Sequence, residues 1–223
     1  MWLEISPDIR DEFPGLEVRL VKLLDVRVDT TPSNMLTAEI NSVAERVKRN
    51  YSLDSLKDVE LVRYYRDFFW RVGLDPTKTR PSAEALIRRL LLGKPFPRVN
   101  TLVDAYNLAS VETLIPIAAF DLDLLKMNLH MRRAREGELF HGIGMDHPQM
   151  MTGREIVVED REKLIAIYPY RDAESTKVTE KTLNTLIMIC GAPKVPAETL
   201  EKATARVIDY VTTFCGGRPS YPD

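Results

Sequence analysis

Residues 155–190 read EIVVEDREKLIAIYPYRDAESTKVTEKTLNTLIMIC, and this stretch decides the fold class. It contains three short runs that are rich in β-branched and other apolar residues, Glu155–Val158, Leu164–Tyr168 and Leu186–Cys190. Charged and turn-forming residues separate the runs, which is typical of β-strands. A fourth run of this kind, Leu129–Arg133, precedes them. The second half of the chain is therefore predicted to form a β-sheet.

The residues before this sheet change from strand to helix periodicity. Between Leu16 and Val28, apolar residues alternate with mostly charged ones, which predicts a half-buried strand, and Met1–Ile5 is expected to pair with it. From Pro32 to Gly73 the apolar residues recur at helical spacing, and Gly73 is a suitable helix stop. One apolar stripe of this region consists of Leu61, Tyr65, Phe68 and Val72.

Two further helices are marked by the residues at their ends. Ser82 is suited to cap the start of one helix, which ends before Gly93, and Pro196 opens the other, which ends before Gly216. The tail Arg218–Asp223 is expected to be frayed. The apolar residues expected on the buried sides are Leu86 and Leu90 in the first helix and Leu200, Ala203, Val207, Tyr210 and Phe214 in the second.

Composition and charge set broad limits on fold and function. The chain has 223 residues, of which 44% are hydrophobic and 29% are charged, so a globular protein is expected. We predict an α+β fold, with a mixed β-sheet core flanked by helices. One domain over residues 1–223 would combine a helix-rich part (1–97) with a sheet-rich part (98–217). The net charge of −2 gives no global basic field, so contact with RNA would require a local basic patch.

The cysteines and the lengths of the apolar runs indicate where in the cell the protein is located. Neither Leu114–Phe120 nor Leu186–Ala192 approaches the roughly 20 apolar residues that a membrane-spanning helix requires. Cys190 is expected in the core, and Cys215 is expected to be partly exposed. Two cysteines without CxxC spacing suit a reducing compartment, and the first residues do not form a signal-peptide pattern. A cytoplasmic location is therefore predicted.

Four segments follow one another in a recognisable order. They are Arg98–Asn107 (RVNTLVDAYN), Ala119–Asp123 (AFDLD), Arg132–Glu138 (RRAREGE) and Thr176–Thr182 (TKVTEKT). This succession resembles the B3/4 domain of the phenylalanyl-tRNA synthetase beta subunit, where V-V-D-x-T-N-Y, H-A-F-D, R-x-A-x-x-G-E and S-x-V-x-x-x-T segments occur in the same order. The resemblance covers roughly residues 98–207. The earlier part is more similar to free-standing proteins that carry this domain alone.

The resemblance implies a β-rich α+β domain that, in the synthetase, receives the acylated end of a tRNA and hydrolyses wrongly attached tyrosine. The chain departs from the synthetase pattern at four places. Tyr106 replaces a threonine, Ala118 a histidine, Tyr168–Asp172 a Gly-Gly turn, and Met188 an acidic residue. The polar groups of the synthetase pocket are thus largely absent, so the resemblance fixes neither tyrosine as the substrate nor catalysis over binding.

Hydrolysis of an aminoacyl ester requires a positioned water, a donor to the developing oxyanion and a group that carries a proton. The vicinal hydroxyl of the terminal ribose can assist, so no Ser-His-Asp arrangement is needed. We expect Asn100, Tyr106 and Arg171 to converge on one cleft. The predicted catalytic residues are Asn100, Tyr106, Asn107, Arg171 and Asp172, and the predicted substrate-binding residues are Asp104, Tyr170 and Thr176.

Structural roles are the alternative for both polar clusters. The Asn and Asp residues within 100–107 suit helix capping and turn bonding equally well, and Tyr170–Asp172 could be a surface turn with an ion pair. His141–His147 holds two histidines and a carboxylate, but their spacing fits no standard zinc pattern. No metal or cofactor is therefore predicted. As a glycine-rich loop, this segment could close over a bound acceptor end.

A basic segment is the candidate RNA contact. Between Val62 and Arg98, nine lysines and arginines stand against three acids, with aromatic residues among them. Such a segment suits phosphate contact with base stacking, and we expect a contiguous patch near the mouth of the cleft. The alternative is a solvated face whose arginines cover core aromatics. The predicted RNA-binding residues are Arg63, Arg66, Arg88, Arg89, Lys94 and Arg98.

The leading hypothesis is a trans-acting aminoacyl-tRNA editing hydrolase, which removes the amino acid from a mischarged tRNA without ATP. Its predicted partners are the tRNA acceptor end and the aminoacyl moiety. There are two alternatives: a non-catalytic module that binds tRNA or its aminoacyl end, and a binder of a small amino-acid derivative that does not meet RNA. No class I or class II synthetase signature is visible, and 25.5 kDa leaves no room for the rest of a synthetase, so amino-acid activation is not expected.

Overall fold

The computed structural model describes residues 3–126 and 128–220, which contain two main β-sheets. The first consists, in order across the sheet, of β1 (Leu3–Ile5), β4 (Leu129–Arg133), β7 (Ile156–Glu159), β8 (Leu164–Ile167) and β9 (Arg171–Asp172). The second consists of β11 (Arg218–Ser220), β2 (Val18–Leu24), β10 (Thr185–Cys190) and β3 (Ile117–Asp121). Strands β5 (Leu139–Phe140) and β6 (Gln149–Met150) form a separate pair. Because β1 and β4 are parallel while β4, β7, β8 and β9 are antiparallel, the five-stranded sheet is mixed.

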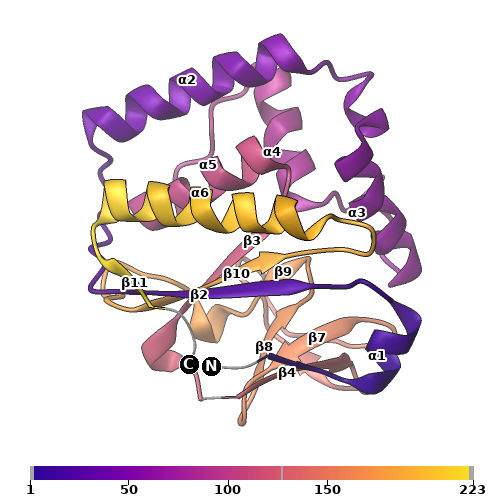
Figure 1. Cartoon of the computed structure of the whole chain (residues 1–223). Coiled ribbons are helices and arrows are strands. Elements are labelled where there is room, and N and C mark those ends of the chain that lie inside the picture. The colour runs from indigo at the N-terminus through magenta and orange to yellow at the C-terminus, as the bar shows by residue number, and fades with distance from the viewer. Residues whose placement is uncertain (1–2, 127, 221–223) are drawn as a thin grey trace.

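The helices form a layer of their own. Helices α2, α4, α5 and α6 lie on one side of the four-stranded sheet, and the five-stranded sheet lies on the other (Figure 1). Helix α6 contacts β2 and β10, and α5 contacts α6, α2 and α4. The predicted α+β class, with a mixed sheet and flanking helices, is confirmed. The helices are α1 (Pro7–Glu12), α2 (Asn34–Asn50), α3 (Glu60–Arg71), α4 (Ser82–Leu91), α5 (Thr101–Thr113) and α6 (Ala197–Cys215), with 3₁₀ turns η1 (Leu56–Asp58), η2 (Leu122–Leu124) and η3 (Glu174–Thr176).

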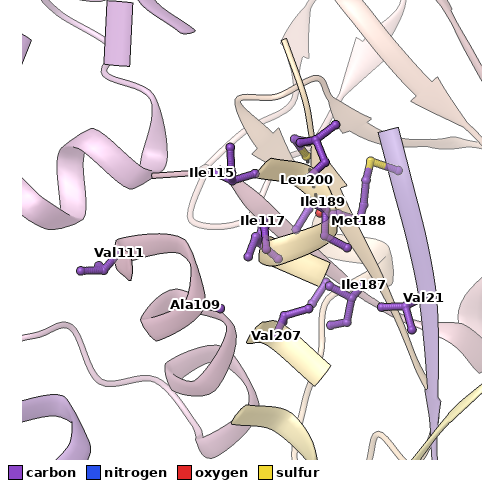
Figure 2. Close-up of a cluster of buried hydrophobic side chains, with 14 of the residues drawn as sticks. Val21, Ala109, Val111, Ile115, Ile117, Ile187, Met188, Ile189, Leu200 and Val207 are labelled. Atoms are coloured by element: carbon purple, nitrogen blue, oxygen red, sulfur yellow. Dashed lines mark hydrogen bonds between the residues drawn. The ribbon is translucent and has the colours of Figure 1, made fainter. Parts of the chain in front are cut away.

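Strand β10 lies at the centre of the core. All of its residues are buried, because β2 and β3 pair with its two edges and α6 packs against it. A strand that is buried on both faces shows an unbroken apolar run, as residues 186–190 do. Figure 2 shows Ile187 and Ile189 of this strand near Val207 and Leu200 of α6. The same core cluster includes Phe68 from the helix-rich part, which favours the single domain that we predict over residues 1–223.

Most predicted elements are confirmed close to their expected ends. The four predicted strands of the second half are β4, β7, β8 and β10, and their ends shift by at most one residue. The strand expected between Leu16 and Val28 is the shorter β2. Helix α3 ends at Arg71, just before Gly73. Helix α6 begins after Pro196, which is its N-cap residue, and ends before Gly216, which is its C-cap residue.

Three expectations about the ends of the chain are wrong. Within the described residues, Leu3–Ile5 pairs with β4 and not with β2, because β10 and β11 occupy both edges of β2. Arg218–Ser220 is not frayed but pairs with β2 as β11. Cys215 is buried, because the last turn of α6 still faces the core. Residues 1–2 and 221–223 lie outside the described residues.

Two expectations about helices also need correction. Ser82 does not cap α4, because Pro81 takes the N-cap position and Ser82 is already the first helical residue. In the sheet-rich part, 98–217, a second helix accompanies the predicted one that follows Pro196, because Thr101–Thr113 forms α5, with most of its sides buried. On α4, Leu90 is buried, whereas Leu86 is half-buried against the core.

Candidate functional site

A cavity of about 160 Å³ lies where the two sheets meet α5. Its walls come from β3 and β10 of one sheet, from β8, β9 and their connection in the other, and from α5. Strand β3 contacts β9 at this junction, so each sheet contributes one side. Much of the wall is apolar and is formed by Pro116, Ile117, Ala118, Ala166, Tyr168, Pro169 and Met188.

Five of the predicted site residues line this cavity. Tyr106 and Asn107 project from α5, while Tyr170, Arg171 and Asp172 come from β9 and the turn before it. The structure thus brings residues from two distant parts of the sequence to one place. It joins Tyr106 to Arg171, as the expected cleft requires, but leaves Asn100 out of the lining.

The other three predicted residues do not line the cavity. Asn100 caps α5, because its side-chain oxygen accepts a hydrogen bond of 2.9 Å from the Val103 N–H. Asp104 is buried and accepts hydrogen bonds from Arg98 Nε at 2.6 Å and from a backbone N–H. Both residues fix the start of α5. Thr176 is fully buried, and its hydroxyl group has no hydrogen-bond partner among the described residues.

Arg171 is held against the loop that contains the two histidines. Its guanidinium group donates to the carbonyl oxygen of Ile143 at 2.7 Å and to the hydroxyl of Tyr170 at 3.1 Å. Gly142 permits this arrangement, because a Cβ atom there would lie 2.4 Å from Cδ of Arg171. The position therefore requires glycine for as long as Arg171 keeps this orientation.

The loop over residues 141–147 is bonded to the cavity wall. The Ile143 N–H donates to the backbone oxygen of Asp172 at 2.9 Å, and the Glu174 N–H donates to that of His141 at 3.0 Å. Nε2 of His141 lies 2.8 Å from the carbonyl oxygen of Met145. Across residues 3–126 and 128–220, no three His, Cys, Asp or Glu side chains are grouped so as to hold a metal ion.

Asp172 is the one acidic residue of the described chain that lines the cavity. Burial raises the pKa of its carboxyl group to about 7, and a hydrogen bond from the backbone N–H of Ala119 offsets only part of this rise. Its neighbour Arg171 does not compensate the charge, since the guanidinium bonds are made to Ile143 and Tyr170. The carboxyl group therefore titrates near neutral pH.

Two other titratable groups of the cavity stay neutral. Burial raises the pKa of the Tyr106 phenol, and the nearby carboxylates of Asp172 and Asp104 add to the rise. Burial also raises the pKa of the Cys190 thiol well above its usual range, so this thiol is a poor nucleophile. Among its described lining residues, the cavity thus offers neutral hydrogen-bond donors, one titratable carboxyl group and the guanidinium group of Arg171, which is bonded to Ile143 and Tyr170, and no activated nucleophile.

Sequence reasoning did not identify the apolar wall of the site. Tyr168 is buried, and its hydroxyl group donates to the carbonyl oxygen of Gly191 at 2.6 Å, so it supports the wall as well as lining it. Ala118 and Met188, two of the positions where the chain departs from the synthetase pattern, also line the cavity. These departures were the available signal, because they replace polar residues of the pattern with apolar ones.

The predicted RNA-binding residues lie on α3, on α4 and in the segment after α4. Arg66 pairs with the buried Glu84 at 2.9 Å, and Arg98 pairs with the buried Asp104. Nε of Arg89 donates to a backbone carbonyl group at 2.6 Å. These three cations are therefore engaged by local groups.

The remaining cations of the basic segment are more open. Lys94 lines a second hollow of about 360 Å³, together with Arg98 and with Lys48 of α2. Arg63 is exposed on α3, the helix that also carries Trp70, whose exposed fraction is 57%. The second hollow shares no lining residue with the cavity. Contact with RNA and a contiguous patch stay predictions.

A model of the B3/4 domain matches residues 64–216, which is more than half of the chain. The chain belongs to the B3/4 domain family. This B3/4 domain is similar to the phenylalanine–tRNA ligase beta subunit of Protochlamydia amoebophila, with 34% identity over 90 residues, which is 40% of this chain and 11% of the relative. It is 26% identical over 187 residues to the same subunit of Dehalococcoides mccartyi, covering 83% of this chain and 22% of that one. The B3/4 chain therefore spans less than a quarter of the length of these relatives.

A solved structure shows the same fold. An N-terminal fragment of the phenylalanyl-tRNA synthetase beta subunit from Pyrococcus horikoshii superposes with a TM-score of 0.50 at 14% identity. The match covers 97% of this B3/4 chain and 49% of that fragment. In the described part of the chain, no helix combines the length and the apolar character that crossing a membrane requires.

Proposed function

We propose that this B3/4 domain is a trans-acting aminoacyl-tRNA deacylase of the cytoplasm. The observation that carries the proposal is the cavity, which gathers Tyr106, Asn107 and Asp172 beside apolar walls. A cavity of about 160 Å³ suits the aminoacyl group of a tRNA and not a whole nucleotide. The family relationship to phenylalanine–tRNA ligase beta subunits supports a ligand that is the aminoacyl end of a tRNA.

Water is the nucleophile of the proposed reaction, because the cavity presents no activated side chain for attack. The water oxygen bonds to the ester carbonyl carbon, the bond to the ribose oxygen breaks, and the carbonyl oxygen becomes negative in the transition state. The protonated hydroxyl of Tyr106 and the amide of Asn107 are the donors that would stabilise this charge. One proton of the water reaches the leaving ribose oxygen, which becomes a hydroxyl group; it is relayed by the vicinal hydroxyl, which accepts this proton and gives up its own, or by the carboxylate of Asp172.

A panel of tRNAs, each charged with a wrong amino acid, tests the proposal. The purified protein is expected to release the amino acid from at least one of them without ATP. Tyr106→Phe should slow the release by about 100-fold, because removal of one oxyanion donor has an effect of that order. Tyr51→Phe is the matched control, since Tyr51 is half-buried outside the cavity and should not affect the rate.

Filter binding of the same tRNAs separates the alternatives. Tyr106→Phe should bind tRNA like the parent, because the residue lines the cavity and not a phosphate track. If no charged tRNA is hydrolysed faster than it decays spontaneously, but tRNA still binds, the domain is a binding module. If tRNA does not bind at all, the protein is a binder of small amino-acid derivatives.

A further inference from the structure

The carboxylate of Asp172 borders the cavity and makes no ion pair within the described part of the chain. The groups that face it are the phenol of Tyr106 on α5, the backbone N–H of Ala119 on β3 and the thiol of Cys190 on β10. All three are neutral at pH 7. Arg171 precedes Asp172 on β9 and also lines the cavity, but its guanidinium group is bonded to Ile143 and Tyr170 and makes no ion pair with Asp172.

The Asp172 residue is half-buried, and removing a carboxylate even partly from water is unfavourable unless a partner compensates it. Buried Glu84 pairs with Arg66, and buried Asp104 pairs with Arg98. The buried carboxylates of Asp121 and Glu155 have no ion pair among the described residues, but they accept hydrogen bonds from the hydroxyl groups of Thr182 and Thr152. Among the described residues, the Asp172 carboxylate has neither an ion pair nor a side-chain donor and is bonded only by the backbone N–H of Ala119, and it is the acid that borders the cavity. The missing positive charge is therefore expected to arrive with the ligand.

The cavity restricts which cation can enter. A metal ion would need several oxygen or nitrogen ligands, and the described residues do not group them here. The walls beside Asp172 include Ala118 and Met188, which cannot solvate a hydrated ion. A primary ammonium group needs one carboxylate and a few neutral acceptors, such as the oxygens of Tyr106 and Asn107.

We propose that Asp172 binds the protonated α-amino group of the aminoacyl ligand. This inference rests on the proposed function and assigns Asp172 a specificity role within it. The ammonium–carboxylate pair fixes the amino acid by its common part and leaves the apolar walls to select the side chain. The vicinal ribose hydroxyl then relays the proton of the attacking water to the leaving ribose oxygen, because the carboxylate is engaged by the ammonium group.

The ammonium–carboxylate pair predicts how the affinity for the ligand depends on pH. Binding requires Asp172 to be ionised and the amine to be protonated. The affinity should rise as the carboxyl group, with its pKa of about 7, loses its proton, and should fall as the amine is deprotonated near pH 8. The phenol of Tyr106 and the thiol of Cys190 keep their protons across this range, so they do not contribute to the profile. A ligand with an acetylated amine should show no such maximum.

Amino-acid amides are suitable probes, because they keep the ammonium group and lack the ester. The amides of phenylalanine, tyrosine, leucine and methionine are compared with their N-acetyl forms by NMR titration of the full chain. At least one free amide should bind the parent about tenfold tighter or more than its acetylated form. Asp172→Asn should remove this difference while keeping the fold, which a thermal melt verifies. Asp123→Asn is the control, because that exposed carboxylate is bonded to Asn184 and lies outside the cavity.

Two outcomes would overturn the inference. The first is equal binding of free and acetylated amides, or no binding of any free amide, by the parent. The second is an Asp172→Asn variant that still prefers the free amine. The deacylation panel tests the proposed function separately. If amides bind through Asp172 but no tRNA is hydrolysed, the amine site is supported and the deacylase activity is rejected. If aminoacyl-tRNA and N-acetylaminoacyl-tRNA are hydrolysed equally fast, the deacylase activity is supported and the amine site is rejected.

Discussion

The hydroxyl group of Tyr65 donates a buried hydrogen bond of 2.7 Å to the carbonyl oxygen of Cys190. Tyr65 lies on α3, and Cys190 is the last residue of β10 and lines the cavity. The next carbonyl group, that of Gly191, accepts the hydrogen bond from Tyr168. Two tyrosines from different parts of the chain thus hold consecutive carbonyl groups at the point where β10 leaves the sheet. These two hydrogen bonds hold the end of β10, where Cys190 lines the cavity.

Tyr65→Phe is expected to destabilise the fold by about 1 to 3 kcal/mol, because the carbonyl group of Cys190 would be buried without a partner. For a chain of this size, each kcal/mol corresponds to a fall in Tm of about 2 to 4 °C. Urea unfolding measures the change. Tyr64→Phe is the matched control, since the Tyr64 hydroxyl bonds the exposed Glu60 and its loss should have little effect. If both variants lose the same free energy of unfolding, the buried hydrogen bond stabilises the fold no more than the exposed one.

Asp172→Asn is expected to stabilise the protein, and more so at higher pH. The folded-state pKa of about 7 lies above the ordinary value of 3.8, so between these values the folded state binds more protons than the unfolded state. Parent stability therefore decreases as the pH rises from about 4 to 7. The asparagine variant lacks this loss, so its Tm should exceed that of the parent by several degrees at pH 8 and by little at pH 4.5.

Thermal melts across this range give the measurement, with Asp123→Asn as the control that should follow the parent at every pH. A difference in Tm that stays constant with pH would show that Asp172 does not titrate as described. A stabilising substitution that also abolishes amine discrimination would indicate that the chain keeps an unfavourable charge for the sake of its ligand.

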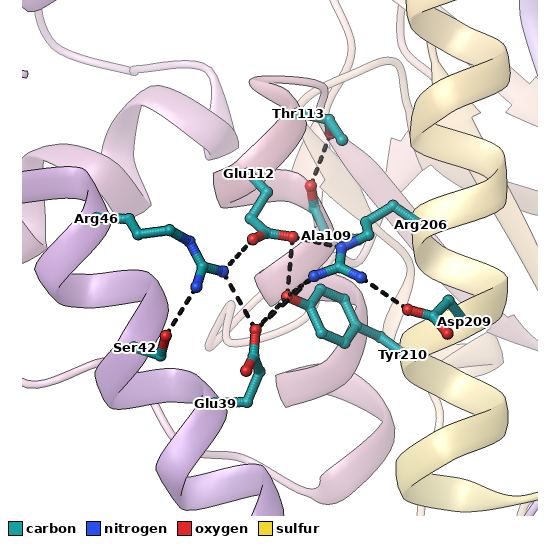
Figure 3. A network of polar contacts seen from close by, with 9 residues as sticks. All are labelled: Glu39, Ser42, Arg46, Ala109, Glu112, Thr113, Arg206, Asp209 and Tyr210. Carbon is teal, nitrogen blue, oxygen red and sulfur yellow. Dashed lines mark hydrogen bonds and ion pairs between the residues drawn. The ribbon is translucent and has the colours of Figure 1, made fainter. Parts of the chain in front are cut away.

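Glu112 joins three helices, because it lies on α5 between Arg46 of α2 and Arg206 of α6 (Figure 3). The hydroxyl group of Tyr210 also donates to it at 2.8 Å. Burial alone would raise the pKa of Glu112, but the hydrogen bonds from Arg206, Tyr210 and Arg46 leave it below its ordinary value. Glu112→Gln should therefore lower the free energy of unfolding at pH 7 by about 1 to 3 kcal/mol.

This deficit should shrink in acid. A carboxylate with a lowered folded-state pKa stabilises the fold above its ordinary pKa, and the contribution disappears as the pH falls through the folded value. Parent and variant should thus converge below about pH 4. Glu198→Gln, which breaks the exposed pair with Lys202, is the control and should change stability little at any pH. A pH-independent deficit would point to packing and not to charge.

Charge reversal at Arg63 and Lys94 tests the basic segment more cleanly than reversal at Arg66 or Arg98. The latter two compensate buried acids, so their removal would destabilise the fold and confuse the result. The reversed pair should weaken tRNA binding and make its salt dependence shallower, by roughly 0.7 to 0.9 in the slope of log K against log salt for each phosphate that the variant no longer neutralises. Filter binding at several salt concentrations measures this.

Reversal of Lys181 and Lys202, two exposed cations outside the basic segment, is the matched control for net charge. If both double variants weaken binding equally, the effect is one of overall charge and not of a specific patch. If neither changes binding at low salt, the basic segment does not face RNA.

Local patterns predicted the elements of this fold where burial is one-sided. Helix α6 exposes one face, and strand β2 is buried at Val21 and Leu23 and half-buried between them, so their apolar residues recur with a visible period. Helix α5 was missed because sequence neighbours are buried together, as in Leu108–Val111, so that most of its sides are covered and polar residues are among those buried. A helix without a polar face shows no such period. The pairing of β1 with β4 was also missed, because the pairing of strands distant in sequence leaves no local mark.

The sequence predicted the kinds of side chain in the candidate site, but not which individual residues line it. The sequence pointed to polar residues in two segments, and Tyr106 and Asp172 from these segments line one cavity. It could not decide between capping and a pocket role for Asn100, since both uses need the same side chain. Only the position of the helix start settles where Asn100 lies. The absence of an ion pair at Asp172 within the described residues depends on the direction of Arg171, which no sequence pattern encodes.

The short strand β11 has a consequence for self-association. Without Arg218–Ser220, strand β2 would be the outer edge of its sheet, with unpaired N–H and C=O groups open to a strand from another molecule. The chain turns closely onto this edge at Gly217, where a Cβ atom would lie 2.6 Å from the carbonyl oxygen of Leu24. The new edge then carries Pro219, which has no N–H to donate, and the exposed Arg218. Three residues thus replace a long edge suited to aggregation by one that resists it.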